Sequence, residues 1–335
     1  MPASNGNKGG EVVAITGASA GVGRATARLF ASQGARLGLL ARDPARLRDT
    51  LAEVEDLGGE GIVVAADVSD PAATEELARA LEEKFGRIDV WINNAMVSVY
   101  SRIWDMPPEE FKRVTEVTYL GAVYGAQAAL RRMLPRSRGT IVQVGSALAY
   151  RSIPFQSAYC ASKHAIRGFL DSLRSELLAE RKGIHVTMVQ LPSLNTPQFE
   201  WTCNRLGQKT KPPPPIYQPE IAAEAICWAA HHDRREIQVG ISTVAAILAN
   251  KVAPWALDRY LAQPGHAFIP TGEPVGPDAE GNLWKPVAGD PGAHGPFDAD
   301  AKPRSPQLEF VKRRNHFAWI GLGLAAAVGY ARRGH

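Results

Sequence analysis

Short apolar runs alternate with amphipathic helical segments along most of this chain, and no other feature restricts its fold as strongly. Six runs of strand length cover residues 12–16, 36–41, 61–65, 90–93, 141–144 and 184–190. Apolar strands separated by helices are typical of a parallel sheet that is covered on both faces, with right-handed crossover connections. We therefore expect an α/β fold, a doubly wound parallel sheet, with its ligand at the carboxyl ends of the strands.

A glycine-rich junction follows the first of these runs. The sequence Thr16-Gly-Ala-Ser-Ala-Gly-Val-Gly23 leads directly into a helical segment at 24–33. Glycine permits a tight turn, and it lets a phosphate approach the backbone N–H groups at the start of a helix, where the helix dipole favours an anion. This junction predicts a phosphate site.

A serine, a tyrosine and a lysine form the second candidate constellation. Ser146 follows the strand at 141–144, and Tyr159 and Lys163 lie four residues apart at the start of a helical pattern. Residues at that spacing project from the same face of a helix. Because a free tyrosine titrates near pH 10, proton exchange at neutral pH needs a pKa lower by about 3 units, which a neighbouring ammonium group could supply in part. The trio suits proton transfer to an alcohol or carbonyl oxygen.

With Asn93-Asn-Ala95 between these two motifs, the chain resembles the short-chain dehydrogenase/reductase family over roughly residues 10–245. The resemblance implies a Rossmann-like fold and a nicotinamide-dependent oxidoreductase acting on a carbonyl/alcohol pair. In this family the tyrosine is the general acid/base, the lysine lowers its pKa and holds the nicotinamide ribose, and the serine orients the substrate oxygen. These roles fall on Tyr159, Lys163 and Ser146. A homo-oligomer, either a dimer or a tetramer, is also implied.

The end of the second strand indicates which cofactor to expect. NAD-preferring members of the family carry an acidic residue there, whereas this chain has Ala41 followed by Arg42. A guanidinium group can bind the 2′-phosphate of NADP, so we expect NADP; the alternative is a solvated arginine. The resemblance implies no metal, and its cofactor-binding positions are Gly17, Ser19, Gly21, Val22, Gly23, Arg42, Asp67, Val68, Asn94, Tyr159, Lys163 and Pro192.

Three departures from the family pattern leave alternatives open. Thr118 stands where many members have an asparagine that holds a water of the proton relay. Met96 replaces a glycine and either lines the cofactor site or fills core. The segment after Pro192 lacks the expected glycine, and Thr196 falls one residue early. The competing hypothesis is a non-catalytic NADP-binding protein of the same fold that its tail tethers to a membrane or partner.

The chain divides into a leader (1–10), a catalytic domain (11–262), an extension rich in proline and glycine (263–307) and a tail (308–335). Within the domain, 193–218 is too long for an ordinary connection, so we expect a lobe that covers an apolar substrate; the alternative is a surface insertion. We expect the extension to be irregular and at most partly ordered. The apolar residues expected to line the substrate site are Leu194, Phe199, Trp201, Leu206, Ile216, Tyr217 and Met96.

Composition narrows the remaining function classes. A net charge of +4 gives no argument for nucleic acid, and the three cysteines show no metal-binding spacing, which favours a reducing compartment. The leader lacks an apolar signal core, so we expect a cytoplasmic protein. The apolar stretch 317–330, flanked by basic residues, is shorter than the usual ~20 residues of a membrane span. It either meets a membrane, on its surface or as a short span, or docks on protein.

Overall fold

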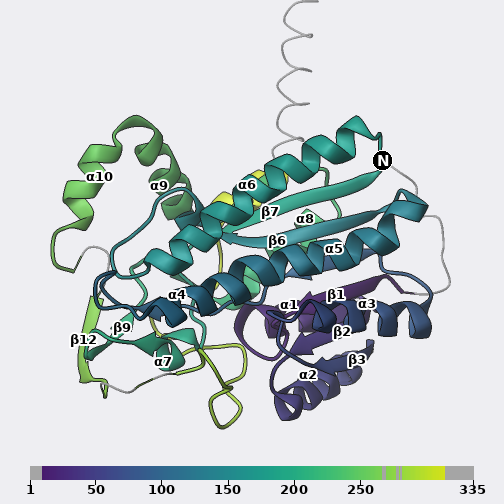
Figure 1. The fold of residues 1–335 in the computed structure, drawn as a ribbon, viewed down its shortest axis with the longest axis horizontal. Coiled ribbons are helices and arrows are strands. Elements are labelled where there is room, and N and C mark those ends of the chain that lie inside the picture. Colours follow the sequence, from purple (N-terminus) through teal and green to yellow (C-terminus); the bar gives the residue numbers. More distant parts are fainter. Residues whose placement is uncertain (1–9, 266–268, 277–278, 280, 314–335) are drawn as a thin grey trace, which may run out of the picture.

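A computed structural model of the chain describes residues 10–265, 269–276, 279 and 281–313. A seven-stranded parallel sheet forms its centre, in the order β11-β7-β6-β4-β1-β2-β3 (Figure 1). This is the doubly wound α/β fold that the alternating pattern predicts. The strands are β1 (Val12–Thr16), β2 (Arg36–Ala41), β3 (Glu60–Ala65), β4 (Val90–Asn93), β6 (Gly139–Ser146), β7 (Ile184–Leu191) and β11 (Glu236–Gln238).

The side chains of β1 alternate between two apolar cores, one on each face of the sheet. Val12 and Ala14 belong to the first core, and Val13 and Ile15 belong to the second. The first core is completed by α3 (Pro71–Phe85), α5 (Gly121–Met133) and α6 (Ser157–Ala179), and the second by α1 (Gly21–Ala31), α2 (Pro44–Asp56) and α8 (Pro219–Ala230). Because both faces are covered, most positions of the central strands β1 and β2 are apolar and buried.

Two aspartates followed by proline start helices on the loops after β2 and β3. Asp43 accepts hydrogen bonds from the backbone N–H groups of the first turn of α2, and Asp70 does the same for α3. Proline at the first helical position has no N–H to leave unpaired. These caps fix where α2 and α3 begin, beside the carboxyl ends of the strands.

The helical region between residues 108 and 133 contains a π-helical segment. It runs as α4 (Pro108–Val114), a π-helix (Thr115–Leu120) and α5. Thr118 is buried in the π segment, and its hydroxyl group accepts from the N–H of Val97 (3.1 Å) and donates to the carbonyl of Val97 (2.9 Å). This pair of bonds fastens the π segment to the loop after β4.

The described part of the extension contains little regular secondary structure. β12 (Ile269–Pro274) pairs with β9 (Gln208–Lys211) of the lobe, and β13 (Ala301–Lys302) pairs with β10 (Ile216–Tyr217). The lobe also contains α7 (Gln198–Trp201) and β8 (Cys203–Asn204), which pairs with β5 (Val99–Tyr100). The extension is thus irregular over most of its described residues, as expected, and two short strands of it pair with the lobe.

Two further helices, α9 (Ile241–Val252) and α10 (Pro254–Leu261), precede the extension, and a helix at 306–313 follows it. Leu308 of this last helix is buried in the second core, and Lys312 forms an ion pair with Glu224 of α8. No helix among the described residues is long and apolar enough to cross a membrane. The leader (residues 1–9) and the apolar stretch 317–330 lie outside the described residues.

Candidate active site

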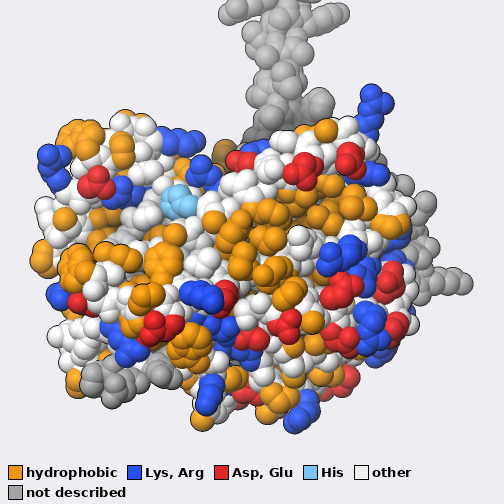
Figure 2. Space-filling view, in the orientation of Figure 1, with side chains coloured by type: hydrophobic (Ala, Val, Ile, Leu, Met, Phe, Trp, Pro, Cys, Tyr) orange, Lys and Arg blue, Asp and Glu red, His pale blue; other side chains and the backbone are white. Residues whose placement is uncertain are grey.

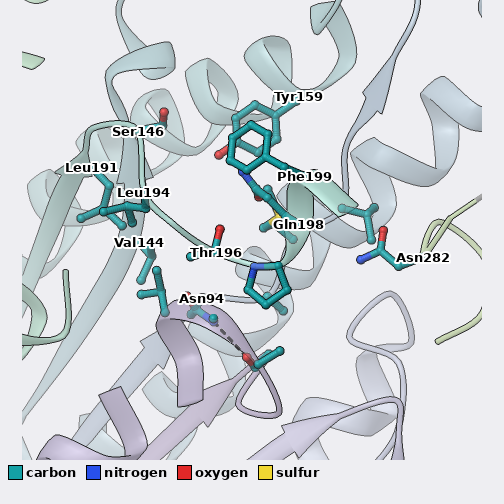
Figure 3. A pocket seen from close by; sticks show the side chains of 18 of the residues that line it. Asn94, Val144, Ser146, Tyr159, Leu191, Leu194, Thr196, Gln198, Phe199 and Asn282 are labelled. Carbon is teal, nitrogen blue, oxygen red and sulfur yellow. Dashed lines mark hydrogen bonds between the residues drawn. The ribbon is translucent and has the colours of Figure 1, made fainter. Parts of the chain in front are cut away.

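A cavity of about 420 Å³ opens at the carboxyl ends of the central strands (Figure 3). The structure brings together there all but one of the predicted site residues. Gly23 is the exception, because it lies behind the glycine turn. The predicted residues that line the cavity are Gly17, Ser19, Gly21, Val22, Arg42, Asp67, Val68, Asn94, Ser146, Tyr159, Lys163 and Pro192.

The glycine turn is packed too closely for any side chain at two positions. A Cβ atom at Gly23 would lie 2.1 Å from the carbonyl oxygen of Gly17, and one at Gly17 would lie 2.8 Å from the Cα of Ala95. Gly17 also has a φ of +66°, which L-residues with side chains rarely adopt. The Asn94 amide donates to the carbonyls of Thr16 (3.0 Å) and Gly17 (3.1 Å) and so joins the end of β4 to the turn.

The start of α1 faces the cavity without a competing anion. Its N-cap residue, Ala20, provides no side-chain hydrogen bond, and the first turn contains no acidic residue. Ser19, Gly21 and Val22 line the cavity at this point. Backbone N–H groups and the helix dipole together make such an end suited to a phosphate. The tight turn and this helix start therefore fit the pyrophosphate of a dinucleotide.

Arg42 lies on the rim of the cavity and contacts the extension. Its guanidinium group donates to the carbonyl oxygens of Asn282 (2.5 Å) and Leu283 (3.2 Å). Burial lowers the pKa of Arg42. The alternative of a solvated arginine therefore does not describe this side chain, which bonds to the extension.

Asp67 lies at the carboxyl end of β3, where its carboxylate pairs with Arg113 and accepts from the N–H (3.0 Å) and hydroxyl (2.9 Å) of Ser69. Burial alone would raise the pKa of Asp67, but the hydrogen bonds from Ser69 and Arg113 lower it overall. The carboxylate is thus held ionised and in place at the edge of the cavity.

Ser146 and Tyr159 meet on the opposite side of the cavity (Figure 3). The Ser146 hydroxyl lies near enough to the phenol of Tyr159 to counteract part of the rise in its pKa, although burial outweighs this effect. Ser146 ends β6, where its N–H donates to the side-chain carbonyl of Gln190 (2.8 Å) and its hydroxyl accepts from the N–H of Leu148 (3.1 Å). Gln190 is fully buried on β7. Sequence reasoning missed this residue, because a glutamine inside an apolar strand carries no motif.

Lys163 does not act on Tyr159 in the way that the family resemblance implies. Burial raises the pKa of Tyr159, and the ammonium group of Lys163 donates instead to the carbonyl oxygen of Val144 at 2.8 Å. Burial lowers the pKa of Lys163 itself to about 8. The lowered tyrosine pKa expected from the sequence is therefore not found in this structure, because desolvation of the buried phenol is the largest influence on it.

The three residues that depart from the family pattern lie in different surroundings. Thr118 uses its hydroxyl on the backbone of Val97, as described above. Met96 and Thr196 both line the cavity, so Met96 is not simply core. A Cβ atom at Gly21 would lie 3.4 Å from the side chain of Thr196, which places this threonine next to the glycine turn.

The lobe closes the rest of the cavity with a different set of residues from the one expected. Leu194, Phe199 and Trp201 line it as predicted, but Ile216 and Tyr217 are buried away from it, Tyr217 in the second core. Leu206 does not line it either. The reason is that β10 turns back into the domain to pair with β13. Residues that sequence reasoning missed also line the cavity, namely Val97, Tyr100, Ile153, Gln156, Thr210, Lys211, Ser242 and Thr243.

Comparison with known proteins decides the family. The sequence profile described as short chain dehydrogenase matches residues 11–203, which is more than half of the chain. The chain belongs to the short-chain dehydrogenase/reductase family. It is 33% identical over 276 residues to the "Uncharacterized oxidoreductase YxnA" of Bacillus subtilis, covering 82% of this chain and 78% of that protein. It is also 39% identical over 191 residues to "Dehydrogenase/reductase SDR family member 7B" of Bos taurus, covering 55% of this chain and 58% of that protein.

Solved structures of the family share the fold. A short chain dehydrogenase from Mycobacterium paratuberculosis bound to NAD superposes with a TM-score of 0.61 at 25% identity, covering 70% of this chain and 97% of its own. An alcohol dehydrogenase from Thermococcus sibiricus, complexed with 5-hydroxy-NADP, gives a TM-score of 0.59 at 28% identity. The match covers 68% of this chain and 94% of that dehydrogenase. This short-chain dehydrogenase is thus an oxidoreductase by family. Among its described residues, no cluster of metal-ligating side chains occurs.

Proposed function

We propose that this protein is an NADP(H)-dependent oxidoreductase that interconverts a carbonyl and an alcohol, with Tyr159 as general acid/base. The observation that carries the proposal is that Ser146 and Tyr159 lie together on the wall of a cavity that also contains a glycine turn suited to a dinucleotide. When bound, the nicotinamide ring supplies or accepts a hydride.

Tyr159 and Ser146 would act together on the substrate oxygen. The raised pKa of the buried phenol keeps it protonated at neutral pH, as an acid that donates to a carbonyl oxygen must be. Ser146 is held by Gln190 and Leu148 and would hold the same oxygen against the phenol. Lys163, fixed by Val144, would bind the ribose next to the nicotinamide and place its charge beside Tyr159.

Arg42 supports a preference for NADP. It lines the cavity at the end of β2, and the carboxylates of the described residues form no ion pair with it. A half-buried guanidinium group without a carboxylate in direct contact would be stabilised by a phosphate, because charge-assisted hydrogen bonds are stronger than those to neutral carbonyl groups. Asp67, Val68, Asn94 and Pro192 would line the remaining length of the cofactor.

The substrate would be largely apolar. Leu194, Phe199 and Ile153 supply apolar surface near the reacting hydroxyl groups, whereas Thr243 has a buried hydroxyl without a hydrogen-bond partner. Pockets of this kind combine apolar walls with a few placed polar groups. We therefore expect a bulky ketone, aldehyde or alcohol, and one polar group of the substrate could bond to Thr243.

A second copy of the chain would pack on α5 and α6. Figure 2 shows a band of hydrophobic side chains across this face, and half-buried Tyr119, Leu130 and Phe169 belong to these helices or adjoin them. Contiguous apolar surface on a soluble domain marks an interaction site. The oligomeric state in solution, measured by light scattering, tests this part of the proposal.

Turnover of a homologous aldehyde series with NADPH tests the proposed function most directly. Catalytic efficiency should rise with chain length by up to about 0.8 kcal/mol per buried methylene group. If catalytic efficiency does not change with chain length, the apolar side chains of the lobe only pack against the domain and do not bind the substrate. If no carbonyl compound is reduced although NADPH binds, the protein is a cofactor-binding protein without catalysis.

A further inference from the structure

Residues 281–292 of the extension, which we call the strap, cross the outer rim of the cavity at its adenosine end. The N–H of Asn282 donates to the carbonyl of Trp201 at 2.8 Å, and the N–H of Gly21 in the glycine turn donates to the carbonyl of Gly292 at 3.1 Å. Figure 1 shows this part of the extension as the yellow-green loop beside α7, and Figure 3 places Asn282 on the side of the cavity away from Ser146. Asn282 and Pro286 line the cavity.

Four arginines from separate parts of the domain hold the strap. Arg24 of α1 pairs with Asp290 (2.5 Å), and Arg46 of α2 donates to the carbonyls of Gly289 (2.7 Å) and Val287. Arg113 of α4 donates to the carbonyl of Leu283 (3.2 Å), and Arg42 donates to Asn282 and Leu283. Except at Asp290, these contacts are made with main-chain oxygens, which are neutral.

The four arginines differ in whether a carboxylate pairs with the guanidinium group. Arg24 also pairs with Glu53 (2.8 Å), Arg46 with Asp43 (3.3 Å) and Arg113 with Asp67. Arg42 has no carboxylate within ion-pair distance among residues 10–265, 269–276, 279 and 281–313. Burial lowers the pKa of Arg42, and the Asp67 carboxylate acts on it only from beyond ion-pair distance, so its direct hydrogen bonds are with carbonyl groups. Among these four arginines, Arg42 is therefore the one at which a bound anion would be stabilised most.

We propose that the strap is a displaceable cover, and that its carbonyl oxygens at Asn282 and Leu283 compete with the 2′-phosphate of NADP for Arg42. A phosphate dianion forms shorter and stronger hydrogen bonds with a guanidinium group than a carbonyl does. Binding of a 2′-phosphorylated adenosine would therefore release residues 282–284, whereas an unphosphorylated one would leave them in place. This inference rests on the proposed NADP preference.

Hydrogen exchange of the full-length protein with two cofactor fragments tests the proposal. Adenosine 2′,5′-bisphosphate carries the phosphate that Arg42 would bind, and 5′-AMP lacks it. We expect the bisphosphate to speed exchange of the backbone amides of the strap, and 5′-AMP to leave it unchanged or slow it. If the bisphosphate binds more tightly than 5′-AMP but slows exchange in the strap, the strap is a fixed wall and only this proposal is overturned.

A variant with a weakened strap gives an independent measurement. Trp284 lies over the guanidinium group of Arg113 (5.7 Å to the ring centre), which itself holds the carbonyl of Leu283, and it is 40% exposed. Trp284→Ala should therefore fold, and it should bind the bisphosphate several-fold more tightly with unchanged affinity for 5′-AMP. Trp255→Ala on α10 is a matched control, because Arg259 lies over that ring at 5.4 Å and neither residue lines the cavity.

The outcomes separate this proposal from the one on which it rests. A loss of bisphosphate affinity in Trp284→Ala, or an equal gain for both fragments, would overturn competition at Arg42. If the bisphosphate binds no better than 5′-AMP in either protein, the proposed NADP preference fails, and the strap proposal fails with it.

Discussion

The ammonium group of Lys163 lies 5.4 Å from the centre of the Tyr159 ring, and its hydrogen bond is made with Val144 instead of the phenol. The lysine therefore meets the face of the ring, while the Ser146 side chain acts on the phenol hydroxyl. Val144 and Ser146 both belong to β6, so the end of one strand positions the lysine and the tyrosine of α6. The consequences for catalysis, pH dependence and cofactor binding can be measured separately.

Tyr159→Phe should abolish turnover and leave NADPH affinity close to that of the wild type. The change removes only the hydroxyl that would donate the proton, and the ring still fills its buried position. Steady-state rates and a cofactor titration are the measurements. Tyr150→Phe is the matched control, since Tyr150 donates to Glu236 (2.6 Å) and does not line the cavity, so its loss should spare turnover. Wild-type rates in Tyr159→Phe would refute the assignment.

Stability should increase with pH above about 8 because of Lys163. Its folded pKa is about 8 and lies below the usual 10.5, so between these values the unfolded chain binds more protons than the folded one. The free energy of unfolding therefore rises in this window, by at most about 1.4 kcal/mol per pH unit, and the penalty for burying the charge is complete below it. Urea titrations at pH 7.5 and 9.5 should show the increase in the wild type and a smaller one in Lys163→Met.

Arg42→Asp should weaken binding of NADP and preserve or improve binding of NAD. The change removes a charge-assisted contact worth about 1.5–3 kcal/mol and adds repulsion of the 2′-phosphate. Arg48→Asp makes the same change in charge on an exposed position of α2, and should affect neither cofactor. Equal losses for NADP and NAD in Arg42→Asp would mean that Arg42 does not select between them.

Gly23→Ala should remove cofactor binding. The added methyl group would lie 2.1 Å from the carbonyl oxygen of Gly17, so the turn must open where the pyrophosphate would approach the backbone. A titration with NADPH measures the effect. Gly168→Ala adds the same methyl group to α6, where nothing lies within 4 Å, and should leave affinity unchanged. Normal affinity in Gly23→Ala would show that the turn does not hold the cofactor.

Two truncations should separate the tail from the fold. Removing residues 314–335 should release the protein from a membrane fraction without altering stability or NADPH affinity. Removing 306–335 should also destabilise it, because the buried Leu308 is lost together with the hydrogen bonds that Gln307 makes to Gly240 and Gln238 (both 2.8 Å). Losing one buried leucine side chain alone costs about 2–5 kcal/mol. A full-length protein that never enters the membrane fraction would favour a tail that docks on protein.

The sequence by itself determined the sheet, the glycine turn, and the grouping of Ser146 with Tyr159 and Lys163. Each of these depends on short-range patterns. Apolar alternation defines strands and helices, glycine permits the turn, and a spacing of four residues puts two side chains on one helix face. Once parallel strands are assigned, their carboxyl ends must meet at one edge, so the predicted residues gather around one cavity.

Only the tertiary structure decided which partners these side chains have. Arg42 is 240 residues from Asn282 in sequence, and no local pattern reveals that its guanidinium group would meet those carbonyls. Gln190 reaches Ser146 across neighbouring strands, and the short strands β12 and β13 of the extension pair with the lobe. The pKa of Tyr159 also depends on the tertiary structure. The sequence places a cation one helical turn away, but burial, which depends on every element around the cavity, raises the pKa.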